Sequence, residues 1–131
     1  FVYPVHLNPN VQAPVEQYLA RHDNIFLIPP LGYPDLIWLM ERSFFVLTDS
    51  GGIQEEAPSL GKPVLVMRNV TERMEGVLAG TARLVGTNSD AIYQAAQTLL
   101  DDPDAYAKMA HAVNPYGDGT TARQIAEILA R

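Results

Sequence analysis

Two short segments that are apolar at every position constrain the fold of this chain more than any other feature. Residues 44–47 read Phe-Phe-Val-Leu, and residues 64–67 read Val-Leu-Val-Met. A strand with one face in water alternates apolar and polar residues, whereas a strand covered by helices on both faces is apolar throughout. The sequence therefore predicts an α/β fold, a doubly wound parallel sheet with helices on both faces.

The rest of the chain fits the same pattern, because short runs rich in β-branched and aromatic residues alternate with longer segments of helical period. We expect ligands outside the carboxyl ends of the strands, in the loops after Val5, Thr48 and Met67. Pro14 is expected in the opening turn of its helix, where a missing N–H is tolerated. The predicted strands are 1–5, 24–28, 44–48, 63–67 and 82–85, and the predicted helices are 11–20, 33–42, 53–60, 71–79, 89–100, 103–110 and 120–131.

Length and composition limit the function classes. The chain has 131 residues, which predicts a single domain, too short for two lobes with a cleft between them. A net charge of −6 leaves no basic surface for nucleic acid. The chain has no cysteine, and its three histidines are scattered, so the sequence predicts no metal site. No apolar run has the roughly 20 residues of a membrane span, so we expect a soluble protein, and the absence of cysteine fits the cytoplasm. Because the chain opens at Phe1 inside a predicted strand, we expect a fragment of a larger protein.

The segment after the third predicted strand carries the strongest signal for a binding site, since it passes through two glycines directly into a helix. The N–H groups of a first helical turn have no partner within the helix, and glycines let an anion approach them without meeting a Cβ atom. Ser50, Gly51 and Gly52 are therefore predicted to hold a phosphate. Alternatively, the glycines only make a tight turn, and Asp49 and Glu55 satisfy the helix end themselves.

Charged residues in the same region are further candidates. Glu56 lies about one turn into the helix, where its carboxylate could accept hydrogen bonds from a ribose diol, or simply be solvated. Arg68 and Arg73 follow the next predicted strand and could bind an anionic ligand. Arg73 could instead pair with Glu72 or Glu75 in solvent.

Other motifs give weaker signals or exclude a class. His6 closes the first predicted strand and could bind phosphate or transfer a proton, or be an ordinary turn histidine, whereas His22 and His111 are assigned no role. Residues 114–120 are interpreted as a turn that caps the last helix, and Asn88 or Ser89 as the cap of an earlier one. Without a G-x-S-x-G motif or a P-loop lysine, hydrolase and NTPase activities are disfavoured.

Taken together, five segments distributed nearly end to end resemble the bacterial non-hydrolysing UDP-N-acetylglucosamine 2-epimerases. Asp-Ser-Gly-Gly-Ile-Gln-Glu-Glu at 49–56 is the most specific of them. The resemblance implies a two-lobed, GT-B-like enzyme that eliminates UDP to a glycal and adds it back with inverted C2, with no cofactor and no metal. By the matched motif, Ser50, Gly51 and Gly52 would hold the diphosphate, Glu56 the ribose, and Arg73 the UDP part of the ligand. The segments are 3–9, 48–57, 61–64, 71–73 and 114–119.

The resemblance also implies what this chain lacks. The family's proton-transferring carboxylates lie in an amino-terminal lobe and its active-site histidine lies upstream, so we predict no catalytic residue here and no activity for the chain alone. A homodimer is implied for the full-length enzyme. His6 matches a histidine that helps bind a second UDP-GlcNAc in regulated members. Leu31 and Leu36 depart from the residues that relatives can place near the uracil, and Met74 stands where proline is usual.

Two other functions remain open at this level. A donor-binding lobe of a GT-B glycosyltransferase would share the glycine turn and the ribose carboxylate but would transfer sugar to an acceptor, and a hydrolysing relative would release free sugar. A non-catalytic α/β interaction module would lack affinity for UDP. Asp49 ends a strand as a receiver-domain aspartate would, but the acidic cluster and late lysine of such domains are missing.

Overall fold

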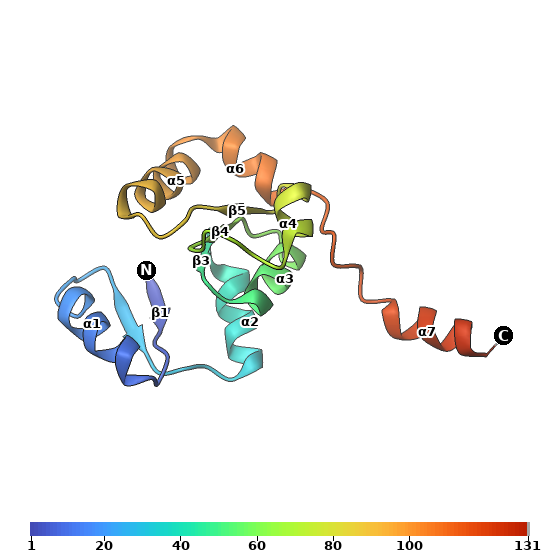
Figure 1. The fold of residues 1–131 in the computed structure, drawn as a ribbon, viewed down its shortest axis with the longest axis horizontal. Coiled ribbons are helices and arrows are strands. Elements are labelled where there is room, and N and C mark those ends of the chain that lie inside the picture. The colour runs from blue at the N-terminus through green and yellow to red at the C-terminus, as the bar shows by residue number, and fades with distance from the viewer. Residues whose placement is uncertain (131) are drawn as a thin grey trace. The chain divides into compact units, whose positions relative to one another are not determined.

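The computed structural model describes residues 1–130 and divides the chain into two compact units, Phe1–Trp38 and the part from Leu39 onward (Figure 1). In the first unit, β1 (Val2–Pro4) pairs in parallel with β2 (Phe26–Ile28), and α1 (Pro9–Leu19) connects them. Helix α2 (Tyr33–Arg42) runs across the boundary between the units. The single-domain organisation stays a prediction.

The second unit is a three-stranded parallel sheet with helical connections, in the strand order β3-β4-β5. Every connection between neighbouring strands in this sheet is a helix, which is the βαβ arrangement that the sequence predicts. Its elements are β3 (Val46–Thr48), α3 (Gly51–Ser59), β4 (Val64–Val66), α4 (Met74–Ala79), β5 (Ala82–Leu84), α5 (Ser89–Asp101), α6 (Pro103–Ala110) and α7 (Thr121–Leu129).

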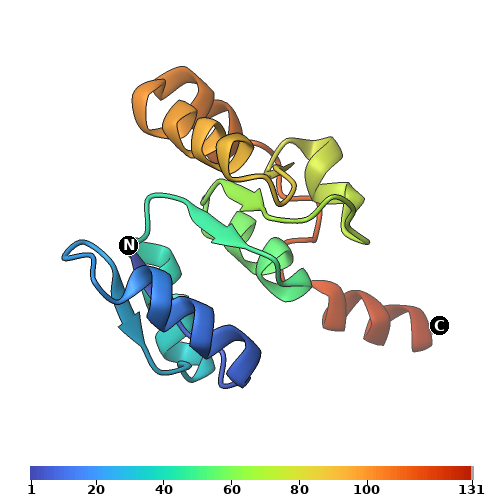
Figure 2. The ribbon, with the colours of Figure 1, turned by 60° about the vertical axis from the view of Figure 1, so that its left-hand side comes forward.

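The core of this unit is built around β4. All three residues of β4 are 0% exposed, and Leu65 packs with Val85, Ala95 and Leu99. Helices α5 and α6 lie on one face of the sheet and α3 lies on the other, as two views show (Figures 1 and 2). The predicted coverage of both faces is thus confirmed for β4. Phe44, predicted to begin the third strand, lies before β3, which starts at Val46, and is half exposed.

Capping side chains set several helix starts. Asn88 accepts hydrogen bonds from the N–H groups of Asp90 and Ala91, as predicted. Asp102 caps α6 in the same way. Asn8 caps α1, which therefore begins at Pro9 and not at residue 11. As a result, Pro14 lies in the second turn of α1, and the predicted position in the opening turn is wrong.

Two further boundaries differ from the prediction. Helix α4 begins at Met74 and not at residue 71, because the Thr71 hydroxyl accepts the N–H of Arg73 in a turn that precedes the helix. The predicted turn at 114–120 does lead into α7, which begins at Thr121 with Thr120 as its N-cap residue, although the Thr120 side chain bonds Asp118 and makes no capping hydrogen bond. Within residues 1–130, no helix has the length and hydrophobicity needed to cross a membrane.

Candidate functional site

The glycine turn after β3 leaves the start of α3 without a cap from the residue that precedes it. Ser50 is the N-cap, with extended backbone angles of φ −79° and ψ 133°, but its hydroxyl makes no capping hydrogen bond. The backbone N–H of Ser50 donates to Thr48 Oγ1 at 3.0 Å. Uncapped N–H groups at a helix start carry partial positive charge, which favours an anion there.

The loop after β4 lies beside this turn, as expected for the carboxyl ends of neighbouring parallel strands. Gln54 joins the two loops: its side chain is 0% exposed, its Nε2 donates to the Ser50 carbonyl at 3.0 Å, and its Oε1 accepts from Thr71 Oγ1 at 2.7 Å. Thr71 in turn accepts the N–H of Arg73 at 3.1 Å. The structure therefore brings Ser50 and Arg73 into one network.

Both arginines of this loop are engaged by carboxylates. Arg73 Nε donates to Glu55 on α3, and Arg68 pairs with Glu72 at 3.1 Å. The predicted alternative, in which Arg73 pairs with Glu72, is wrong, because Glu72 pairs with Arg68. In the described part of the chain Arg73 forms no ion pair with Glu75 either. With Glu55 bound to Arg73, the alternative that Glu55 satisfies the helix end loses its support.

A carboxylate already occupies the space against the first residue of α3. A Cβ atom on Gly51 would lie 2.8 Å from Glu72 Oε1, so glycine is what lets this oxygen approach. The pKa of Glu72 is lowered, first by its own backbone N–H and also by the Arg68 guanidinium. A carboxylate oxygen of the neighbouring loop thus lies close to the first residue of α3, although groups outside the helix cause the lowered pKa.

The remaining predicted residue of this site, Glu56, lies in the second turn of α3 and is half-buried. Among residues 1–130 its carboxylate forms no hydrogen bond or ion pair, in contrast to Glu55 beside it. Its role toward a ribose stays a prediction. The phosphate contacts of Ser50, Gly51 and Gly52 and the nucleotide contact of Arg73 likewise stay predictions.

Behind the arginine loop, Tyr116 connects the turn at 114–119 to the start of α4. Its hydroxyl donates to the Arg73 carbonyl at 3.2 Å and accepts the N–H of Gly76 at 3.0 Å. Burial raises the pKa of Tyr116, which keeps the hydroxyl protonated and able to donate. No sequence pattern indicated this role of Tyr116, nor the roles of Gln54 and Thr71.

The side chain of His6 is exposed and takes part in a turn. Its Nδ1 accepts the N–H of Asn8 at 3.1 Å, immediately before α1. This contact agrees with the interpretation of His6 as a turn histidine, while its binding of an effector stays a prediction. Leu31 and Leu36 are half-buried, and their relation to a uracil is equally untested.

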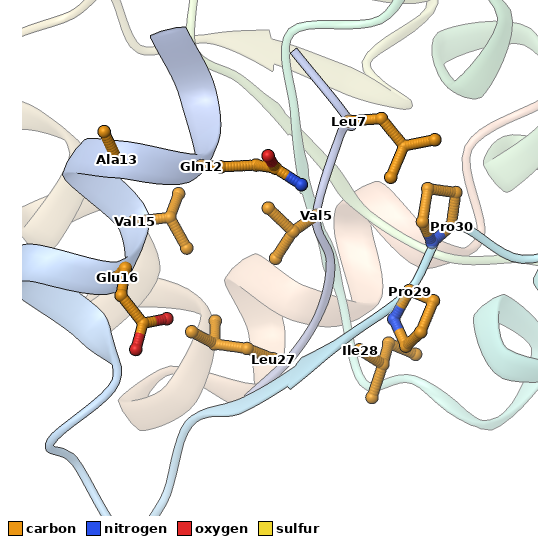
Figure 3. A pocket seen from close by; sticks show the side chains of 10 residues that line it. All are labelled: Val5, Leu7, Gln12, Ala13, Val15, Glu16, Leu27, Ile28, Pro29 and Pro30. Atoms are coloured by element: carbon orange, nitrogen blue, oxygen red, sulfur yellow. The ribbon is translucent and has the colours of Figure 1, made fainter. Parts of the chain in front are cut away.

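The first unit contains a hollow of about 510 Å³ between α1 and the two strands (Figure 3). Val5, Val15 and Leu27 face this space, and Glu16 is the carboxylate on its wall. None of the residues predicted to bind a nucleotide lines it. An apolar wall of this kind has few donors for a phosphate, so the hollow adds nothing to the candidate site.

Comparison with known proteins gives the same family along the whole described chain. A family model described as UDP-N-acetylglucosamine 2-epimerase matches residues 1–130. The chain is 59% identical to a UDP-N-acetylglucosamine 2-epimerase of Campylobacter jejuni, over 98% of this chain and 33% of that protein. The chain thus spans about a third of the length of the curated relatives it matches.

Solved structures agree in fold. The UDP-GlcNAc 2-epimerase of Neisseria meningitidis bound to UDP-GlcNAc superposes with a TM-score of 0.94 at 50% identity, over 99% of this chain and 35% of that one. The S. aureus MnaA–UDP co-structure superposes with a TM-score of 0.93 at 52% identity, over 98% and 35%. From the family match over residues 1–130 and this agreement in fold, we conclude that the chain belongs to the UDP-N-acetylglucosamine 2-epimerase family.

Proposed function

We propose that this chain is the UDP-binding part of an enzyme that interconverts UDP-GlcNAc and UDP-ManNAc. The observation that carries the proposal is the uncapped glycine start of α3, tied by Gln54 to the loop of Arg73. Two relatives of the same fold were solved with UDP or UDP-GlcNAc, which supports a uridine nucleotide as the ligand.

In the proposed mechanism, the chain stabilises UDP as it leaves the sugar and holds it until it is added back. The N–H groups of Gly51 and Gly52 and the hydroxyl of Ser50 would bind the diphosphate, Glu56 the ribose, and Arg73 the UDP part of the ligand. Such fixed donors stabilise the negative charge that develops on the leaving group. Glu72 would have to move from Gly51 when the diphosphate binds, because two anions cannot share that position.

The groups that remove and return the sugar proton are proposed to come from outside this chain. Two carboxylates of the site are already paired with arginines, Glu55 with Arg73 and Glu72 with Arg68, which makes them poor candidates for a general base. We propose that the complete enzyme carries these groups on an amino-terminal lobe, forms a dimer, and acts in the cytoplasm.

A calorimetric titration of the complete protein with UDP tests the proposed site. Ser50→Ala and Glu56→Ala should each weaken UDP binding by about 10- to 100-fold, the loss of one hydrogen bond to a charged or strongly polar group. Ser59→Ala, at the other end of α3, and Glu127→Ala, on the exposed helix α7, are matched controls that should bind UDP as the wild type does. Equal affinity in all five proteins would refute the site.

The reaction itself separates the proposal from its alternatives. Incubation of the complete protein with UDP-GlcNAc alone should yield UDP-ManNAc, detected by anion-exchange chromatography or NMR. Release of UDP that requires an added sugar acceptor would instead identify a glycosyltransferase. Accumulation of free ManNAc would identify a hydrolysing enzyme, and no turnover together with no UDP affinity would favour a non-catalytic module.

A further inference from the structure

Gln54 is a fully buried polar side chain on α3. It is 0% exposed, and within residues 1–130 no buried side-chain N or O atom lacks a partner. Leaving a buried amide unpaired costs about 1–3 kcal/mol, so its two partners are required by its burial. One partner, Ser50, lies in the loop after β3, and the other, Thr71, lies in the loop after β4, so the two bonds join both loops of the candidate site.

The first bond fixes the direction of a backbone donor. The Ser50 carbonyl, which receives Gln54 Nε2 at 3.0 Å, belongs to the same peptide group as the Gly51 N–H. In a trans peptide these two bonds point in opposite directions, and the described chain has no cis peptide. Because Gln54 lies four residues further along α3, a carbonyl held by it points along the helix, and the Gly51 N–H points past the amino-terminal end of α3. Glycine has no Cβ to restrict its backbone angles, so the bond from Gln54 adds a constraint that the glycine lacks.

The second hydrogen bond of Gln54, to Thr71, orients a group in the neighbouring loop. Thr71 Oγ1 donates its proton to Gln54 Oε1 at 2.7 Å and accepts the N–H of Arg73 at 3.1 Å. Because the hydroxyl has a single proton, an acceptor at Gln54 decides which way it points and leaves its lone pairs toward Arg73. Residues 17 positions apart in the chain are thereby set at a fixed separation.

We propose that Gln54 is a positioning residue that sets the spacing between the Gly51 N–H and Arg73 for binding a diphosphate. It acts through the Ser50 carbonyl and the Thr71 hydroxyl and does not itself touch the ligand. This inference rests on the proposed function, since a diphosphate is the ligand that both loops would share. It predicts that Gln54 governs discrimination between a diphosphate and a monophosphate more than it governs stability.

The test measures the affinities of the complete protein for UDP and UMP by calorimetry. Gln54→Met keeps the side-chain length and removes both hydrogen bonds, so UDP binding should weaken about tenfold, as expected for about 1.4 kcal/mol, and UMP binding much less. Gln54→Glu keeps the acceptor for Thr71 but places a carboxylate oxygen against the Ser50 carbonyl. It should lower the ratio of UDP affinity to UMP affinity by a similar factor. Gln124→Met, on exposed α7, should leave both affinities unchanged.

Thr71 provides a second route, should the Gln54 variants fail to fold. Thr71→Val removes the hydroxyl with little change in shape and should also lower the ratio of UDP to UMP affinity, whereas Thr71→Ser should recover what valine loses. If Ser50→Ala weakens UDP binding but the Gln54 and Thr71 variants keep the wild-type ratio, this inference is overturned and the proposed site stands. If Ser50→Ala has no effect either, the proposed function fails with it.

Discussion

Replacement of Gly76 by alanine tests how closely the turn at 114–119 packs against α4. A Cβ atom on Gly76 would lie 2.7 Å from Tyr116 Oη and 3.3 Å from Thr81 Oγ1. The tyrosine hydroxyl cannot simply rotate away, because it is bonded to the Gly76 N–H at 3.0 Å and to the Arg73 carbonyl at 3.2 Å. The substitution must therefore move the ring and stretch both bonds.

The expected change in the free energy of unfolding follows from two destabilising effects and one stabilising effect. Overpacking costs about 1–3 kcal/mol, and each weakened hydrogen bond adds about 0.5–1.5 kcal/mol. Alanine in a helix offsets about 0.5–1 kcal/mol of this relative to glycine. We expect Gly76→Ala to lower the free energy of unfolding by about 1–5 kcal/mol. With Tyr116→Phe already present, the contact at 2.7 Å is gone, and the same change should cost less than about 1 kcal/mol.

Urea unfolding followed by circular dichroism, on the wild type, the two single variants and the double variant, measures this coupling. We expect the double variant to be more stable than the sum of the single effects by at least about 1 kcal/mol. Effects that add within about 0.5 kcal/mol would show that the hydroxyl does not constrain Gly76, and the described packing of Tyr116 would be refuted.

Two further predictions concern the core and the arginine loop. Leu65→Ala should lower the free energy of unfolding by about 2–5 kcal/mol because Leu65 is 0% exposed, whereas Leu100→Ala, at a position that is 55% exposed, should change it by less than about 0.5 kcal/mol in urea unfolding. Arg68→Gln should raise the pKa of Glu72 toward its ordinary value in an NMR titration, and no change would mean that its own backbone N–H and the nearby Arg73 account for the lowering without Arg68. Because the folded pKa of Glu72 is lowered, its contribution to stability is present above the unfolded pKa and is lost as the pH falls through the folded value.

Local chemistry made much of the fold predictable. An apolar run such as 64–67 indicates a covered strand by composition alone, and Asn88 and Asp102 cap helices through hydrogen bonds that reach two or three residues. The same reasoning failed at α3, whose start was expected at residue 53. Glycines are poor helix formers, yet Gly51 and Gly52 form the first turn of the helix.

The contacts that join the candidate site could not be read from neighbouring residues. Gln54 meets Thr71 across 17 positions, and Tyr116 meets Gly76 and Arg73 across 40 and 43. A buried glutamine and a tyrosine in a glycine-containing turn have no local pattern that names their partners. By contrast, the turn residues Ser50 to Gly52 and the arginine loop were predictable, because parallel strands bring their carboxyl ends to one edge.

Strand β4 pairs with β3 and with β5, and the loops after β3 and β4 leave from adjacent positions of the sheet. The backbones of neighbouring strands lie about 4.7–4.9 Å apart in all sheets, whatever their side chains. The length of an anion that bridges both loops is therefore limited by main-chain geometry. Substitutions in the loops can alter how tightly such an anion is bound, but the distance that the anion must span is set by the spacing of the strands.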